Sequence, residues 1–303
     1  MVPSSLKCPA CGARLGKNPA EALASHMYRM ARASNPAHVM WLNQNISKKQ
    51  VSERGLSELL TEFLDFSKTG LKKWLRLKFI QKFYGREPHP FVLALQHPSR
   101  EVLLGYVIEH QHFLRQWVRS CSYIMARTEE EDVTLYELDN INTEFGGFGA
   151  ERPSHYELLL RMGESLGLAR EKVLSTPPLP DTRWALHVWD RIAARDDWVE
   201  AMAAMHGLEL IADRSVKEDG ATITYFDPRI LSGNEVSSAA AAFLREGYEA
   251  DVVHSGEALD LVEKYARTKG NEPDVQATFL RSLDAFDSYL MARLQRSRML
   301  ASP

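Results

Sequence analysis

Acidic and imidazole side chains interrupt three otherwise apolar helical stripes of this 303-residue chain. The first stripe lies in LLGYVIEHQHFLRQW and carries Glu109 and His112. Glu209 interrupts the second, in WVEAMAAMHGLELIAD, and Asp251 and His254 interrupt the third, in AAFLREGYEADVVHSGEALDLV. Buried carboxylates and imidazoles cost several kcal/mol unless they are paired, protonated or bound to a metal. The interruptions therefore predict a functional centre between helices.

The spacing of these groups favours a metal. Glu109 and His112 are one helical turn apart, as are Asp251 and His254, so each pair can bind one ion. Glu-x-x-His pairs do so in helical di-iron proteins, and such ligands suit iron better than zinc. His110 points about 100° away and is a weaker candidate. We predict one or two Fe(II) ions, held by Glu109, His112, Glu209, Asp251 and His254.

Composition excludes several classes of protein. The net charge is −3 with acids and bases interspersed, which gives no support for general binding to nucleic acid or to a membrane surface. No apolar run reaches the roughly 20 residues of a membrane span, and MVPSSLKCPACG lacks the apolar core of a signal peptide. We therefore expect a cytoplasmic protein with no membrane partner and no nucleic acid.

Helical periodicity dominates the chain after the polar segment ISKKQVSERG. The segments expected to be helical include residues 101–127, 182–194, 198–213, 237–268 and 273–295, and no alternating pattern of sheet length is present. We predict an all-α fold, divided into a small module at residues 1–50 and a helical domain at 51–303. Cys121, which stands alone, is predicted to be a small buried side chain.

The first residues form a cysteine knuckle, Cys8-Pro-Ala-Cys11, followed by Gly12. Two such thiolates can grip a tetrahedral zinc ion, and His26 and His38 are the best candidates for the other two ligands. We predict a structural zinc site that resembles two-Cys, two-His fingers; two free thiols or a redox pair are the alternatives. The following helix offers few basic residues, so a protein partner is a better expectation than DNA.

Four motifs follow one another in a recognisable order: HYELLLRMGESLGLAREKVL, LPDTRWALHVWDRIA, WVEAMAAMHGLELIAD and GYEADVVHSGEAL. Their order resembles the heme-oxygenase-like superfamily, in particular pyrroloquinoline-quinone synthase C and the heme-oxygenase-like di-iron oxidases. The resemblance covers about residues 60–295. It implies a bundle of seven or eight helices, and in the di-iron members a Glu and a His, then a Glu, then a His-x-x-x-Asp-x-x-His run.

The resemblance assigns Glu109 and His112 to the first pair, Glu209 to the second helix, and Asp251 and His254 to the last motif. Gly247 stands where that motif has its leading histidine, so one iron would lose an imidazole. The quinone-synthase branch acts without metal and also ends in Asp-x-x-His, which leaves a metal-free oxidase as an alternative. The thiaminase branch needs a nucleophilic cysteine, and Cys121 is not in an obvious position for it.

The resemblance implies a biosynthetic oxidase that uses iron and dioxygen on a small metabolite bearing a carboxylate, such as an amino acid derivative. A cation should anchor the carboxylate, and the candidates are Arg115, Arg183 and Arg191. His187 and His206 are further candidates for substrate binding or proton transfer, and His155 either shapes the pocket or caps its helix. Tyr225 and Phe226 are expected in a lid. The rival is a non-catalytic adaptor, and a homodimer is left open.

Overall fold

The computed structural model describes residues 6–16, 19–147, 152–232 and 236–301, with the backbone alone at residue 19 and at residues 248–255. Regular structure in these ranges is helical apart from a single β-bridge between Lys7 and Arg14. The prediction of an all-α fold is confirmed. Among the described residues, none of the helices combines the length and the hydropathy that a membrane span requires.

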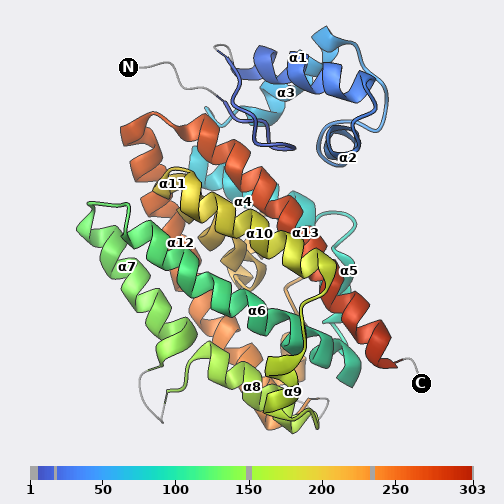
Figure 1. Cartoon of the computed structure of the whole chain (residues 1–303), viewed down its shortest axis with the longest axis vertical. Helices are drawn as coiled ribbons and strands as arrows, with labels where there is room; N and C mark the ends of the chain where they lie inside the picture. Colours follow the sequence, from blue (N-terminus) through green and yellow to red (C-terminus); the bar gives the residue numbers. More distant parts are fainter. Residues whose placement is uncertain (1–5, 17–18, 148–151, 233–235, 302–303) are drawn as a thin grey trace.

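Three helices form a small unit at one end of the molecule (Figure 1). Pro36 begins the second of them with the backbone torsion that a first helical turn needs, and the side chains of Asn35 and Ser52 cap the second and third. The last helix packs against the first, although it follows the division predicted at residue 50, which stays a prediction. These helices are α1 (Pro19–Arg32), α2 (Pro36–Asn45) and α3 (Glu53–Leu64).

The remaining described residues build a helical bundle (Figure 1). It has ten α-helices in the described ranges, more than the seven or eight expected, because the short helices α5 and α9 lie in connections. The α-helices are α4 (Leu71–Phe83), α5 (Pro90–Ala94), α6 (Arg100–Met125), α7 (Glu131–Ile141), α8 (His155–Ser165), α9 (Arg170–Ser175), α10 (Pro180–Arg195), α11 (Trp198–His206), α12 (Ser238–Lys269) and α13 (Glu272–Ala301). Shorter turns are η1 (Asn142–Gly146), η2 (Gly207–Ile211), η3 (Arg214–Lys217) and η4 (Pro228–Leu231).

Helix α6 lies at the centre of the bundle and makes its most extensive helix contact with α13. Gly105 permits the close approach, since a Cβ atom there would overlap the carbonyl oxygen of Arg293 and lie 2.9 Å from the amide nitrogen of Ser297. The helix also packs against α7, α8, α10 and α11, so most of its faces are buried. An apolar stripe therefore cannot identify which face of α6 meets the functional site.

The N-terminal unit is tied to the bundle by buried ionic contacts. Lys7 Nζ lies 2.6 Å from Glu200 Oε2 and 2.8 Å from Asp196 Oδ1, and the Thr278 hydroxyl donates to the same Glu200 oxygen at 2.6 Å. Glu200 belongs to α11 and Thr278 to α13. The knuckle is thus anchored directly on two helices of the bundle.

One predicted helix is shorter than expected. The segment 198–213 was predicted as a single helix, but α11 ends at His206 and the chain continues as the 3-10 turn η2. The turn begins at Gly207, where a Cβ atom would lie 2.5 Å from Phe279 of α13. The change of helix type places Glu209 on a tighter turn than a continuous α-helix would give it.

Candidate functional site

The four predicted zinc ligands converge in the N-terminal unit. The donor atoms of Cys8, Cys11, His26 and His38 all lie within 4.8 Å of one another. Cys8 Sγ is 3.6 Å from His38 Nε2, and Cys11 Sγ is 3.5 Å from His26 Nε2. His38 contributes despite its long sequence interval because it comes from α2, after the chain has turned back. This arrangement is that of a closed, tetrahedral metal site.

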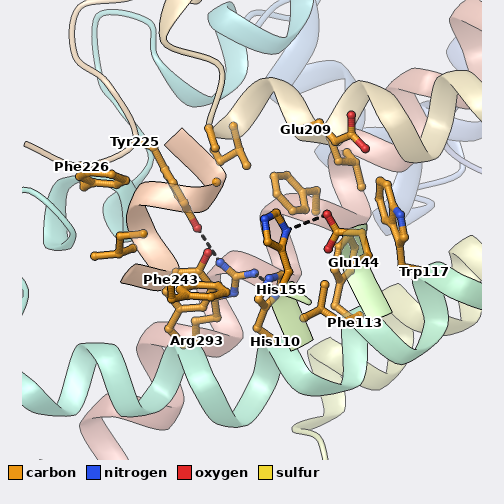
Figure 2. A pocket seen from close by; sticks show the side chains of 18 residues that line it. His110, Phe113, Trp117, Glu144, His155, Glu209, Tyr225, Phe226, Phe243 and Arg293 are labelled. Carbon is orange, nitrogen blue, oxygen red and sulfur yellow. Dashed lines mark hydrogen bonds and ion pairs between the residues drawn. The ribbon is translucent and has the colours of Figure 1, made fainter. Parts of the chain in front are cut away.

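A second candidate functional feature is a partly open cavity of about 90 Å³ in the bundle. Its wall comes from α6, α8, α12 and α13, together with η1, η2 and the segment that carries Tyr225 and Phe226. Most of the wall is aromatic or aliphatic, as Figure 2 illustrates. The lid expected at Tyr225 and Phe226 thus lies against the cavity. The polar side chains in the wall are His110, Glu144, His155, Glu209, Tyr225, Arg293 and the Tyr106 phenol.

Glu144 and His155 form a pair on the cavity wall. His155 Nδ1 lies 2.8 Å from Glu144 Oε1, and both residues are buried. Ser154 caps α8 and fixes the start of the helix that carries His155, while Glu144 comes from the π-turn η1. Figure 2 shows the pair meeting at one side of the cavity. A carboxylate on one imidazole nitrogen orients the ring and makes its other nitrogen more basic.

Glu209, the second acid of the wall, is held by a network of hydrogen bonds and ion pairs. Its Oε1 accepts a hydrogen bond from Asn140 Nδ2 at 3.2 Å and lies 3.0 Å from His206 Nδ1. His206 Nε2 lies 2.8 Å from Glu137 Oε1. Burial opposes a charged imidazole, but the carboxylates of Glu137 and Glu209 outweigh it and raise the pKa of His206 to about 10. The positive charge of His206 therefore lies between the Glu137 and Glu209 side chains.

Two predicted iron ligands do not reach the cavity. Glu109 is completely buried, but its Oε1 lies 2.7 Å from Arg296 Nε and its Oε2 accepts a hydrogen bond from the Leu179 amide at 3.2 Å. His112 Nε2 lies 3.0 Å from the Thr176 carbonyl oxygen. These side chains face α13 and the segment before α10, so the structure does not bring them together with the acids of the cavity wall. The cavity face of α6 instead carries His110, which we had ranked lower.

Other predicted residues fall in different places. Arg183, Arg191 and His187, predicted to bind substrate, are exposed on α10 and outside the cavity wall, and Arg115 is exposed on α6. His206 is buried behind Glu209, and the side chains of Asp251 and His254 lie outside the described residues. Glu144 and Arg293 line the cavity but are not among the candidates that the sequence patterns indicated. Arg293 was detectable, since it places a cation in the apolar stripe of α13 after Phe286 and Tyr289.

Fold and cavity together define a helical protein of the heme oxygenase-like fold. A domain of unknown function with this fold from Shewanella denitrificans OS217 superposes with a TM-score of 0.58 at 17% identity, covering 78% of this chain and 95% of that one. The chain belongs to the TENA/THI-4/PQQC family, whose model matches residues 74–296. Residues 6–65 match the model of a C2H2 type zinc finger.

Two further solved structures have the same fold. A TenA homologue from P. horikoshii OT3 has a TM-score of 0.57 at 15% identity, covering 76% of this chain and 99% of that one. A CADD-like protein of unknown function from Nostoc punctiforme PCC 73102 has a TM-score of 0.55 at 19% identity, covering 78% and 99%.

A curated relative matches part of the chain. Pyrroloquinoline-quinone synthase from Cronobacter sakazakii (strain ATCC BAA-894) is 30% identical over 116 residues, which are 37% of this chain. The match spans 45% of the relative's own length. The family therefore includes enzymes, and the resemblance stated from the sequence is confirmed at the level of family and fold.

Proposed function

We propose that the protein is a non-heme iron oxidase that uses dioxygen to oxidise a small carboxylate-bearing metabolite in the cavity. The Glu144–His155 pair carries this proposal. It brings a carboxylate and an imidazole, 2.8 Å apart, to the wall of a buried cavity that is otherwise mostly apolar. These are the ligand types that ferrous iron uses when open positions are kept for dioxygen.

The remaining ligands in this proposal come from η2 and α12. Glu209 lines the cavity, and its Oε1 lies 3.0 Å from His206 Nδ1. Gly247 of α12 also lines the cavity, and Asp251 and His254 follow it by four and seven residues, which is the repeat of one helix face. The revised set is Glu144, His155, Glu209, Asp251 and His254. It keeps the predicted carboxylate-rich chemistry and replaces Glu109 and His112.

Bound ferrous iron would supply the activation of dioxygen. The chain's own residues would shape the site: the aromatic wall would limit the access of bulk water, and the His206 network would hold Glu209 in place. A dry, preorganised site strengthens every electrostatic interaction with a bound substrate. The finger would hold a structural zinc ion apart from the iron, through Cys8, Cys11, His26 and His38.

Metal-free oxidation is the second candidate, and one observation favours it. Within the described residues, the groups of three or more converging His, Cys, Asp or Glu donors are the finger and the trio Cys121, Glu137 and His206, so Glu144 and His155 have no third donor there. An imidazole oriented by a carboxylate also serves as a general base without any metal. The partial likeness to a pyrroloquinoline-quinone synthase supports oxidation in either form.

Iron analysis of the full-length protein tests the proposal. After anaerobic reconstitution with ferrous iron, we expect at least one iron per chain in the wild type and in Cys8→Ser/Cys11→Ser, which should lose only zinc. His155→Gln should lose iron, while His187→Gln, at an exposed position, should keep it. A wild type without iron above background would contradict the iron proposal. Oxygen uptake that survives an iron chelator would establish the metal-free alternative.

A further inference from the structure

Arg293 of α13 is a buried cation that has no acidic partner among the residues whose side chains the structure describes. It is only 2% exposed, and no carboxylate of the described residues lies within ion-pair distance of its guanidinium. Three other bases with side chains of low exposure behave differently, since each forms an ion pair with an acid. These pairs are Lys7 with Glu200, Arg76 with Asp213, and Arg296 with Glu109.

The groups that do contact Arg293 are neutral. Its guanidinium donates to Tyr225 Oη at 2.7 Å and Tyr289 Oη at 2.6 Å, and Nη2 lies 2.8 Å from His110 Nδ1. Burial raises the pKa of the Tyr106 and Tyr289 phenols above the ordinary range, and burial together with Arg293 lowers the pKa of His110 well below it. None of these neighbours therefore supplies a negative charge near neutral pH.

Aromatic rings hold the guanidinium in one orientation. Its carbon lies 4.1 Å from the ring centroid of Tyr106, 4.4 Å from that of Tyr289 and 5.1 Å from that of Phe91. Such cation–π contacts stabilise an arginine but do not replace a counter-ion in a medium of low dielectric. The Nε atom also has no hydrogen-bond partner among the described residues. The site thus holds a positive charge that no carboxylate of the described residues pairs with.

We propose that Arg293 is the anchor of an anion subsite and that the cavity binds a small planar carboxylate. A carboxylate would form a charge-assisted hydrogen bond with the Nε–H group, which has no partner among the described residues, and Tyr225 lies beside the guanidinium at the cavity wall (Figure 2). The planar body of the ligand would lie among the rings of Phe113, Phe226 and Phe243. A cavity of about 90 Å³ suits a single-ring acid and not a heme-sized ligand.

Arg293 differs in its surroundings from the arginines that the sequence suggested as anchors for a carboxylate. Arg115, Arg183 and Arg191 are exposed, where water screens them and a carboxylate gains little. Arg293 is desolvated before the ligand arrives, so the attraction is stronger and is specific for a negative charge. Binding of the anion at this subsite needs no iron. Only the oxidation of the bound ligand rests on the proposed function.

Titration calorimetry with matched ligands tests the subsite in full-length protein to which no iron has been added. The probes are nicotinate and benzoate, with nicotinamide as the uncharged analogue of nicotinate. We expect the wild type to bind the acids and to bind nicotinamide at least tenfold more weakly. Arg293→Met should lose at least tenfold in affinity for the acids. The affinity of Arg293→Lys should lie between those of the wild type and Arg293→Met, because lysine keeps the positive charge but not the planar guanidinium.

Arg183→Met is the control and should bind as the wild type does. Circular dichroism establishes that each variant is folded, and Arg293→Lys keeps the test valid should Arg293→Met not fold. Binding of neither acid to the wild type, equal binding of nicotinamide, or unchanged affinity in a folded Arg293 variant would overturn the subsite. Since no iron is present, these outcomes are independent of the iron analysis above.

Discussion

Arg293 and Arg296 lie one turn apart on α13, yet their surroundings differ in a way that separates structure from function. Arg296 forms an ion pair with Glu109 of α6, and the Leu179 amide satisfies the second carboxylate oxygen. Arg293 faces the cavity among neutral phenols, an imidazole and aromatic rings. A buried charge whose partner is already present holds helices together, whereas one without a charged partner is available to a ligand.

The same distinction applies to acids. Glu109 is the more deeply buried, which made it the more attractive ligand from sequence, but its bonds are complete within the fold. Glu144 is less obvious in the sequence, but it lies on the cavity wall together with Glu209. Burial therefore does not identify a functional residue; the identity of the group that compensates its charge does.

Removing the acid of the structural pair should have the largest effect. Glu109→Leu leaves Arg296 with a buried, unpaired charge, so we expect the free energy of unfolding to fall by about 3–5 kcal/mol. Glu109→Leu/Arg296→Met should recover most of this loss, because no charge is left unpaired. Chemical denaturation measures both. A double variant as unstable as the single one would contradict the structural role.

The close contact of α6 with α13 should rank second. Gly105→Ala introduces a Cβ atom that overlaps the Arg293 backbone, so we expect a loss of about 1–3 kcal/mol from overpacking. Gly256→Ala is the matched control, since no atom lies within 4 Å of its added Cβ and alanine is the better helix former. Thermal denaturation should show a lower Tm for the first and an equal or higher Tm for the second.

His110 should make stability depend on pH. Burial, then Arg293 and His155, lower its pKa well below the ordinary value, so the folded state keeps it neutral while the unfolded state takes up a proton below about pH 6.5. The folded protein should therefore lose about 1.4 kcal/mol of stability between about pH 7.5 and about pH 5.5 from this group. The loss should be absent in His110→Phe and retained in His187→Gln. Equal pH slopes for both variants would refute this role.

The smallest effect on stability is expected for the ligand anchor. Arg293→Met removes hydrogen bonds to Tyr225 and Tyr289 but also removes a buried charge that no acid compensates. We expect a net loss of about 1 kcal/mol by denaturation, well below that of Glu109→Leu. A loss as large as that of Glu109→Leu would show that Arg293 is primarily structural.

Local patterns in the sequence were sufficient for the helices and for the finger. The segments predicted at 101–127 and 237–268 correspond to α6 (Arg100–Met125) and α12 (Ser238–Lys269). Ser99 and Ser237 cap them at their first turns, which is a signal that depends only on neighbouring residues. The finger is similar, because two of its ligands lie in one short knuckle and the others follow soon after.

The cavity could be predicted only in part, since it depends on how buried helices are rotated against one another. Helix α6 is covered on most faces, so its polar interruptions had two alternative explanations, a metal site or an ion pair across to α13. The partner of Glu109 is 187 residues away, which no local pattern reveals. Glu144 was overlooked because it lies in a glycine-rich segment without a helical stripe.

Anomalous diffraction at the iron edge, from crystals of the full-length protein loaded anaerobically with ferrous iron, tests the central assignment most directly. The account predicts iron in the cavity next to Glu144 and His155, with no peak beside Glu109. A peak coordinated by Glu109 and His112 would contradict it and restore the ligand set inferred from the stripes. Crystals that take up no iron in the bundle would leave the cavity to metal-free chemistry.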